Sequence, residues 1–138
     1  MDGPESFGLN VCEEVPQEMI EKIIGKAIEK TETSSTSTGT NCKYFTNLDR
    51  YEHVLIQVSY LSAENQKSGQ EMMNRNTTIN QLIPMENFIA FQDDGEINAI
   101  YLIMTPGKFV RIDRTRETAD NEQLIDLAKQ VAKIILGE

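Results

Sequence analysis

Apolar side chains recur at helical spacing near both ends of the chain. Over residues 16–28 they lie three and four positions apart, which predicts an amphipathic helix with one buried face. That face comprises Met19, Ile20, Ile23, Ile24, Ala27 and Ile28. Gly25 would lie inside this helix. Another helix is predicted after Asp120, which can form a capping box with Gln123, and it should stop at Gly137. Its buried stripe comprises Leu124, Leu127, Ala128, Val131, Ile134 and Ile135.

Five shorter stretches predict β-strands, because their apolar and β-branched residues lie between turn-forming residues. They cover residues 42–46, 53–61, 88–92, 97–105 and 109–115. The first two flank a turn-rich segment and predict a hairpin. The last three are separated by an Asp-Asp-Gly-Glu turn and a Pro-Gly turn. They therefore predict a three-stranded meander.

The remaining segments are more polar. Ser62 can cap a helix over residues 63–75, although its apolar face is thin. Residues 31–41 are almost entirely Ser, Thr, Gly, Glu and Asn, which predicts a mobile loop. Residues 1–11 have little periodicity and predict a flexible lead-in, which leaves 12–138 as a single domain.

This order of elements (helix, two strands, helix, three strands, helix) predicts the α+β class. Runs of consecutive strands pair as neighbours in antiparallel sheets, whereas parallel sheets alternate strands with helices. We therefore expect an antiparallel sheet of about five strands, packed with two or three helices.

The charge balance excludes some partners. With 22 acidic and 13 basic residues the formal net charge is -9, which opposes binding to nucleic acids and to anionic membrane surfaces. No apolar run approaches the roughly 18 residues that a transmembrane segment needs. The first five residues do not resemble a signal peptide. If the protein is exported, we expect that Met1 replaces a removed leader.

The two cysteines are the most informative residues. Cys12 lies just before the first predicted helix, and Cys42 opens the first predicted strand. Such a pair can join the start of a helix to the start of a strand. We therefore predict a disulfide between Cys12 and Cys42, which would indicate an oxidising compartment.

No catalytic constellation is visible in the sequence. His53 is the only histidine, so any Cys–His or Ser–His chemistry would depend on it. Four carboxylates cluster around the first helix, but that helix turns them toward solvent: Glu13, Glu14, Glu18 and Glu21. Metal-ligand spacings and nucleotide-binding loops are also missing, so we predict no cofactor.

Two weak candidates for partner binding remain. Basic residues gather near the last predicted strand and could bind an anionic partner, or else form surface ion pairs: Lys108, Arg111, Arg114 and Arg116. Met72 and Met73, on the thin second helix, could line an adaptable binding groove or could pack ordinarily at the rim of the core.

Four short segments together resemble the small bacterial envelope lipoprotein domains grouped as DUF3558-like and LpqN-like. They are Cys12 with Ile23-Ile24-Gly25 after it, the strand opening Cys42-Lys43-Tyr44, the apolar run Ile100–Ile103, and the closing helix at 124–136. The resemblance implies an exported α/β sandwich with a bridge between the two cysteines and no known catalytic residues. The chain departs from that pattern at residues 84–87, where those domains have a glycine-rich segment, and it has no lipidation box.

These observations favour a non-enzymatic extracytoplasmic domain that binds a small ligand or a protein partner. The alternative is a cytoplasmic interaction or regulatory domain with two free thiols. An enzyme that uses carboxylates at the edge of the sheet is a third class.

Overall fold

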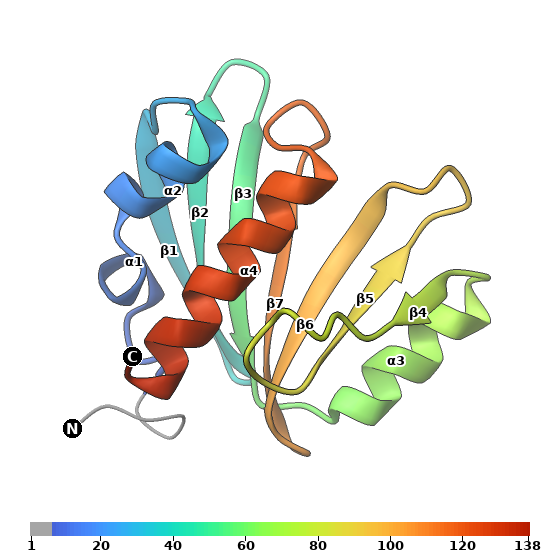
Figure 1. The fold of residues 1–138 in the computed structure, drawn as a ribbon. Helices are drawn as coiled ribbons and strands as arrows, with labels where there is room; N and C mark the ends of the chain where they lie inside the picture. The colour runs from blue at the N-terminus through green and yellow to red at the C-terminus, as the bar shows by residue number, and fades with distance from the viewer. Residues whose placement is uncertain (1–6) are drawn as a thin grey trace.

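The computed structural model describes residues 7–138, which form one antiparallel sheet with helices on both faces (Figure 1). The described helices are α1 (Val11–Glu14), α2 (Gln17–Ile24), α3 (Ala63–Met72) and α4 (Asn121–Leu136). The described strands are β1 (Lys30–Thr36), β2 (Gly39–Asn47), β3 (Glu52–Ser59), β4 (Asn76–Thr78), β5 (Asn87–Phe91), β6 (Ile97–Thr105) and β7 (Lys108–Arg114). The predicted α+β class with an antiparallel sheet is confirmed.

The sheet joins two blocks of consecutive strands in the order β1-β2-β3-β7-β6-β5-β4. The predicted hairpin is β2–β3, and the predicted meander is β5–β6–β7. Strands β3 and β7 pair antiparallel at the centre, from Val54 opposite Arg114 to Ser59 opposite Phe109. Because the last strand of the chain lies beside the third, the centre of the sheet depends on a long-range pairing.

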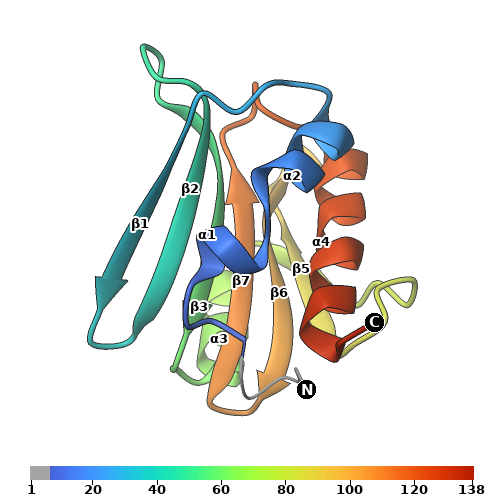
Figure 2. The ribbon, with the colours of Figure 1, turned by 90° about the vertical axis from the view of Figure 1, so that its left-hand side faces the viewer.

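Alternating side chains give the sheet two unlike faces. The face under α4 carries the main core, where residues such as Val54, Ile56 and Ile112 are fully buried. Helices α2 and α4 cover this face (Figure 2). On the other face, α3 packs over a smaller cluster that includes Phe88 and Tyr101. Farther along this face, Phe45 of β2 is buried against the rings of Tyr51 and His53.

The predicted mobile loop at 31–41 is wrong. Most of it forms edge strand β1 and its turn into β2, with seven continuous residue pairs from Lys30–Phe45 to Thr36–Gly39. Threonine favours strands, and an edge strand needs only one neighbour, so main-chain hydrogen bonds order a segment that buries almost nothing. Gly39 is required at the turn, since a Cβ there would lie 1.9 Å from the Val58 carbonyl oxygen.

Two other expectations also change. The short edge strand β4 was not predicted, so the sheet has seven strands rather than about five. The first helix is shorter than predicted: α2 ends at Ile24, and Gly25 is its left-handed C-cap, with φ 71°, rather than an interior residue. Ala27 is consequently exposed, whereas Ile28 remains buried after the helix.

The beginning of the chain is only partly described. Residues 1–6 of the expected lead-in lie outside the described residues. Phe7 and Val11 are buried in the main core, and the Lys108 ammonium donates a hydrogen bond of 2.8 Å to the Phe7 carbonyl. Residues 7–11 therefore contribute two side chains to the core.

The predicted disulfide and the final helix are confirmed. The Cys12–Cys42 bridge joins α1 to β2 with a Cα–Cα distance of 5.3 Å. Helix α4 begins with the capping box of Asp120 and Gln123 and ends at Gly137. Of the predicted stripe, Leu124, Leu127, Ala128, Val131 and Ile135 are fully buried. Within residues 7–138, no helix combines the length and the hydrophobicity that crossing a membrane requires.

Candidate functional site

Helix α3 is held to the sheet mainly by polar contacts. It begins at Ser62, whose hydroxyl accepts a hydrogen bond of 3.2 Å from the Asn65 amide, and only Ala63 and Gln70 of the helix are buried. Beneath it lies an aromatic floor in which Phe88 and Tyr101 stack with ring centroids 4.4 Å apart. This sparse apolar attachment leaves grooves along both sides of the helix.

Gln70 is the centre of the polar contacts. Its side-chain Nε2 donates to the Tyr101 hydroxyl at 2.8 Å. Its Oε1 accepts from Arg75 Nη1 at 3.0 Å and from Asn98 Nδ2 at 3.2 Å. The Tyr101 hydroxyl also accepts from Arg111 Nη1 at 3.0 Å. One buried glutamine therefore connects α3 to strands β6 and β7 and brings two guanidinium groups to the same place.

These residues line a polar groove of about 370 Å³ beside α3. Its lining comprises Asn65, Gln66, Gly69, Gln70, Met73, Arg75, Asn98 and Arg111. Arg111 is neutralised by Asp113, with 2.9 Å between Arg111 Nε and Asp113 Oδ2. Arg75 has no carboxylate within ion-pair distance among the described residues. The groove therefore contains one uncompensated positive charge, and we take it as the candidate site.

A second hollow of about 340 Å³ lies on the other side of α3. Phe88, Ile103 and Pro106 give it an apolar part, and Glu64, Lys67 and Glu86 are among the other lining residues. No buried polar network adjoins it in the described part of the chain. It offers room for the apolar part of a ligand but little that would orient one.

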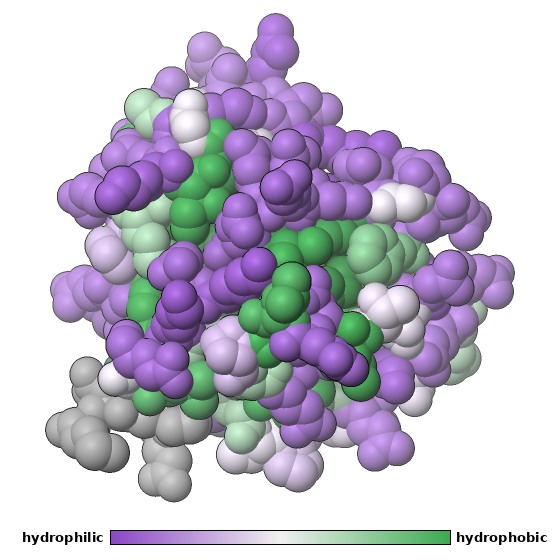
Figure 3. All heavy atoms as spheres, viewed as in Figure 1, coloured by the Kyte–Doolittle hydropathy of each residue, from purple (hydrophilic) through white to green (hydrophobic). Residues whose placement is uncertain are grey.

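The face of α4 has a further hollow of about 580 Å³, where Met19 and Ile23 of α2 meet Gln130 of α4. Figure 3 shows patches of apolar surface on this face within a mostly hydrophilic surround. Its charged lining residues are the exposed Glu18 and Lys22 of α2. The lining contains no buried polar group, so we favour the groove beside α3.

The basic residues predicted as one partner-binding patch are divided between the two faces of the sheet. Lys108 and Arg114 lie an even number of residues from the core residue Val110 and share its face of the sheet, whereas Arg111 faces the side of α3. Lys108 is 8% exposed and lies over the Tyr60 ring at 5.2 Å. Only Arg111 of the predicted set lines the candidate groove.

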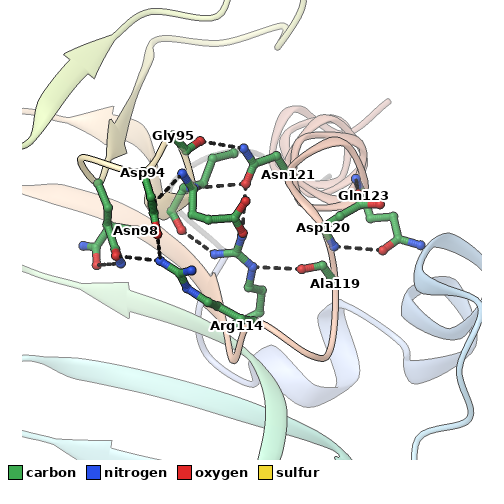
Figure 4. Close-up of polar contacts among 12 residues, drawn as sticks. Asp94, Gly95, Asn98, Arg114, Ala119, Asp120, Asn121 and Gln123 are labelled. Atoms are coloured by element: carbon green, nitrogen blue, oxygen red, sulfur yellow. Dashed lines mark hydrogen bonds and ion pairs between the residues drawn. The ribbon is translucent and has the colours of Figure 1, made fainter.

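Arg114 is enclosed by the protein, with a side chain that is 2% exposed (Figure 4). Its guanidinium donates to the Ala119 carbonyl at 3.0 Å, to Asn121 Oδ1 at 3.1 Å, to Glu96 Oε1 at 3.3 Å and to the Ile97 carbonyl. Burial lowers the pKa of this guanidinium, and the Glu96 carboxylate opposes that shift. Arg114 therefore joins the β5–β6 turn to the start of α4.

Arg116 and Asp94 form an exposed pair at the same end of the sheet. Arg116 Nη2 donates to the Asp94 carboxylate and, at 3.0 Å, to Gln92 Oε1. The hydrogen bond from Arg116 lowers the pKa of Asp94, and the same bond raises the pKa of Arg116. The predicted surface ion pairing is thus present for Arg116.

The two predicted methionines lie at the end of α3. Met72 is 85% exposed and Met73 is 64% exposed, so neither packs in the core. Met73 lines the candidate groove, and its sulfur accepts a hydrogen bond from Arg75 at 3.4 Å. Met72 is not among the groove's lining residues.

The residues considered for catalysis have structural partners. His53 Nδ1 lies 2.8 Å from the Tyr51 carbonyl oxygen, and its ring lies 5.5 Å from that of Phe45. Glu14 and Glu21, which were expected to face solvent, instead accept main-chain hydrogen bonds from Gly8 and Ile28. Among residues 7–138 no group of three or more His, Cys, Asp or Glu side chains is placed to hold a metal ion.

The residues that form most of the hydrogen bonds in the groove were not identified from the sequence. Gln70, Tyr101 and Arg75 lie on α3, on β6 and just after α3, and each alone resembles an ordinary surface or strand residue. The one signal in the sequence was the thin apolar face of the predicted helix. A helix with so few apolar residues has to pack on the sheet with a polar side chain, here Gln70.

Comparisons of the chain with protein-family models, with curated proteins and with solved structures found no match.

Proposed function

We propose that this protein is a non-enzymatic extracytoplasmic domain that binds a small ligand in the groove beside α3. The observation that carries the proposal is the groove of about 370 Å³ whose wall is the Gln70 network. Ligand sites of small domains have this size and combine a few oriented polar groups with a preformed hollow. The side chains of Gln70 and Asn98 are fixed by hydrogen bonds, so they would orient a ligand with little loss of entropy.

The disulfide supports the extracytoplasmic part of the proposal. Disulfides persist in oxidising compartments and are uncommon in reducing ones. The bridge also consumes both thiols, so neither cysteine can act as a thiolate nucleophile. This supports binding rather than thiol catalysis, and it disfavours the alternative of a cytoplasmic domain with two free thiols.

A test of the site is to fill the groove without disturbing the fold. A Cβ added at Gly69 meets nothing within 4 Å, so Gly69→Phe would place a ring in the groove. Gly107→Phe is the matched control, because Gly107 is also unobstructed and lies outside the groove lining, in the β6–β7 turn. The measurement is a small-molecule screen followed by two-dimensional ¹H–¹⁵N NMR.

We expect ligands that shift the Gly69, Gln70 and Asn98 resonances of the parent protein to lose binding in Gly69→Phe and to keep it in Gly107→Phe. If every ligand bound equally well to both variants, the groove would not be the site. Resonance shifts confined to residues of the other hollows would also mean that the groove is not the site.

A protein partner is the second candidate. Four of the nine large apolar side chains that are exposed among the described residues lie within residues 72–82: Met72, Met73, Ile79 and Leu82. Such side chains can mark a protein contact when they gather on a surface. A partner that binds there should still bind Gly69→Phe but not a variant in which Met72 and Leu82 are replaced by serine.

A further inference from the structure

Hydrogen-bond donors outnumber acceptors in the cluster behind the groove. Two acceptors, Gln70 Oε1 and the Tyr101 hydroxyl oxygen, receive four donors: Arg75, Asn98, Gln70 Nε2 and Arg111. The Tyr101 proton is a further donor. The four donors occupy the two lone pairs of each oxygen, so the Tyr101 proton is the donor in excess. Because Tyr101 is fully buried, an unpaired hydroxyl proton there is costly unless another acceptor is supplied.

The orientation of the Gln70 amide is determined by its neighbours. If the amide were reversed, its NH₂ group would face the Arg75 guanidinium, which has donors only. The amide oxygen must therefore point to Arg75, and its nitrogen must point to Tyr101. With Arg111 also donating to it, the Tyr101 hydroxyl has no acceptor for its own proton among the described residues.

The charges in the groove also favour a ligand that supplies hydrogen-bond acceptors. Arg111 has Asp113 as its counter-charge, but Arg75 has none within 4 Å in the described part of the chain. The guanidinium of Arg75 uses only Nη1 in its contacts with Gln70 and Met73, so its remaining N–H groups can bind oxygen. The carboxylates that line the neighbouring hollow belong to Asp93 and Asp94, and Asp94 forms an ion pair with Arg116.

We infer that the groove binds a small organic monocarboxylate, with its carboxylate on Arg75 and Arg111. This inference rests on the proposed function and names the chemistry of the ligand. A single uncompensated cation matches a single negative charge. A dianion would be repelled by Asp93, by Asp94 and by the net charge of -9. The exposed Met73 beside Arg75 would contact the organic part of the ligand.

A carboxylate oxygen that enters between Gln70 and Arg111 would also accept the Tyr101 proton. The Tyr101 hydroxyl is hydrogen-bonded directly to both Gln70 and Arg111. The Arg111 side chain is 28% exposed, so it can move to admit the ligand. The ligand would then complete a network that is short of acceptors.

The test is NMR titration of the disulfide-bonded protein with acetate, benzoate and octanoate. Benzamide serves as the neutral match for benzoate, and inorganic phosphate serves as the more highly charged anion. Arg75→Gln removes the uncompensated cation. Arg50→Gln is the control with the same charge change, because Arg50 is exposed in the β2–β3 turn and lies outside the groove lining.

We expect at least one monocarboxylate to shift the Arg75 Nε–H and Gln70 side-chain resonances saturably. Its affinity should fall about tenfold or more in Arg75→Gln and stay unchanged in Arg50→Gln, as for a lost charge-assisted hydrogen bond. Benzamide should not bind at this place, and phosphate should bind more weakly.

Four results would overturn the carboxylate inference: no saturable shift with any monocarboxylate, equal binding of benzoate and benzamide, tighter binding of phosphate, or equal losses in the two arginine variants. Neutral ligands that bind the groove and are blocked by Gly69→Phe would leave the proposed function intact while removing this inference. If ligands bound Gly69→Phe as tightly as the parent protein, both the proposed function and the carboxylate inference would be refuted.

Discussion

Replacement of the buried Arg114 by methionine should destabilise the protein far more than the removal of an exposed charge. Methionine keeps most of the volume but none of the donors. The carbonyls of Ile97 and Ala119, both in buried residues, would each lose a hydrogen bond. An unsatisfied buried acceptor costs about 1–3 kcal/mol. Glu96 is 37% exposed and can be rehydrated, so its lost ion pair adds less.

Two such acceptors give an expected loss of about 2–6 kcal/mol in the free energy of unfolding. For a domain of this size the melting temperature should fall by roughly 10 °C or more. Urea unfolding followed by circular dichroism measures the loss, and Arg50→Met is the exposed control, with an expected change of less than about 0.5 kcal/mol. A loss below about 1 kcal/mol for Arg114→Met would refute the reasoning, because it would mean that water or neighbouring groups satisfy both carbonyls.

Three other outcomes are expected. Thiol titration of the denatured, unreduced protein should detect no free thiol, and replacing both disulfide cysteines by alanine should cost roughly 3–4 kcal/mol for a loop of 30 residues; two free thiols would contradict the bridge. Leu127→Asp should unfold the protein, because it buries an unpaired carboxylate, whereas Gln130→Asp on the exposed side of α4 should melt close to the parent; equal melting temperatures would mean that the buried face is misassigned. Arg116→Gln should raise the pKa of Asp94 toward its usual value in an NMR pH titration. Since the pKa of Asp94 is lowered in the folded protein, the small stability gain from this pair is present above the unfolded pKa and should disappear as the pH falls through the folded pKa, and an unchanged pKa in the variant would contradict that cause.

The sequence alone determined the elements with strong hydrophobic periodicity. Helix α4 was predicted with its capping box and its buried stripe, because 3.6-residue spacing and capping chemistry are local properties. The hairpin β2–β3 and the meander β5–β7 followed from alternation and turn residues. The Cys12–Cys42 bridge followed from the position of each cysteine at the start of an element.

Only the tertiary structure decided the polar parts of the fold. Strand β1 has no apolar pattern to detect, and it exists because the neighbouring strand β2 supplies its hydrogen bonds. Likewise, no local signal distinguishes the buried Arg114 from the partly exposed Arg111, since they lie three residues apart on one strand and face opposite sides of the sheet.

The candidate groove belongs to this second class. Gln70, Arg75 and Arg111 come together only because α3 packs over β5, β6 and β7. The pairing of β7 with β6 places Arg111 beside Tyr101. The spacing of apolar residues along the chain predicts which side chains are buried, because it is a local property. A hydrogen-bond network depends instead on distances between segments that are far apart in sequence. The sequence therefore determined the apolar core, and the tertiary structure determined the site.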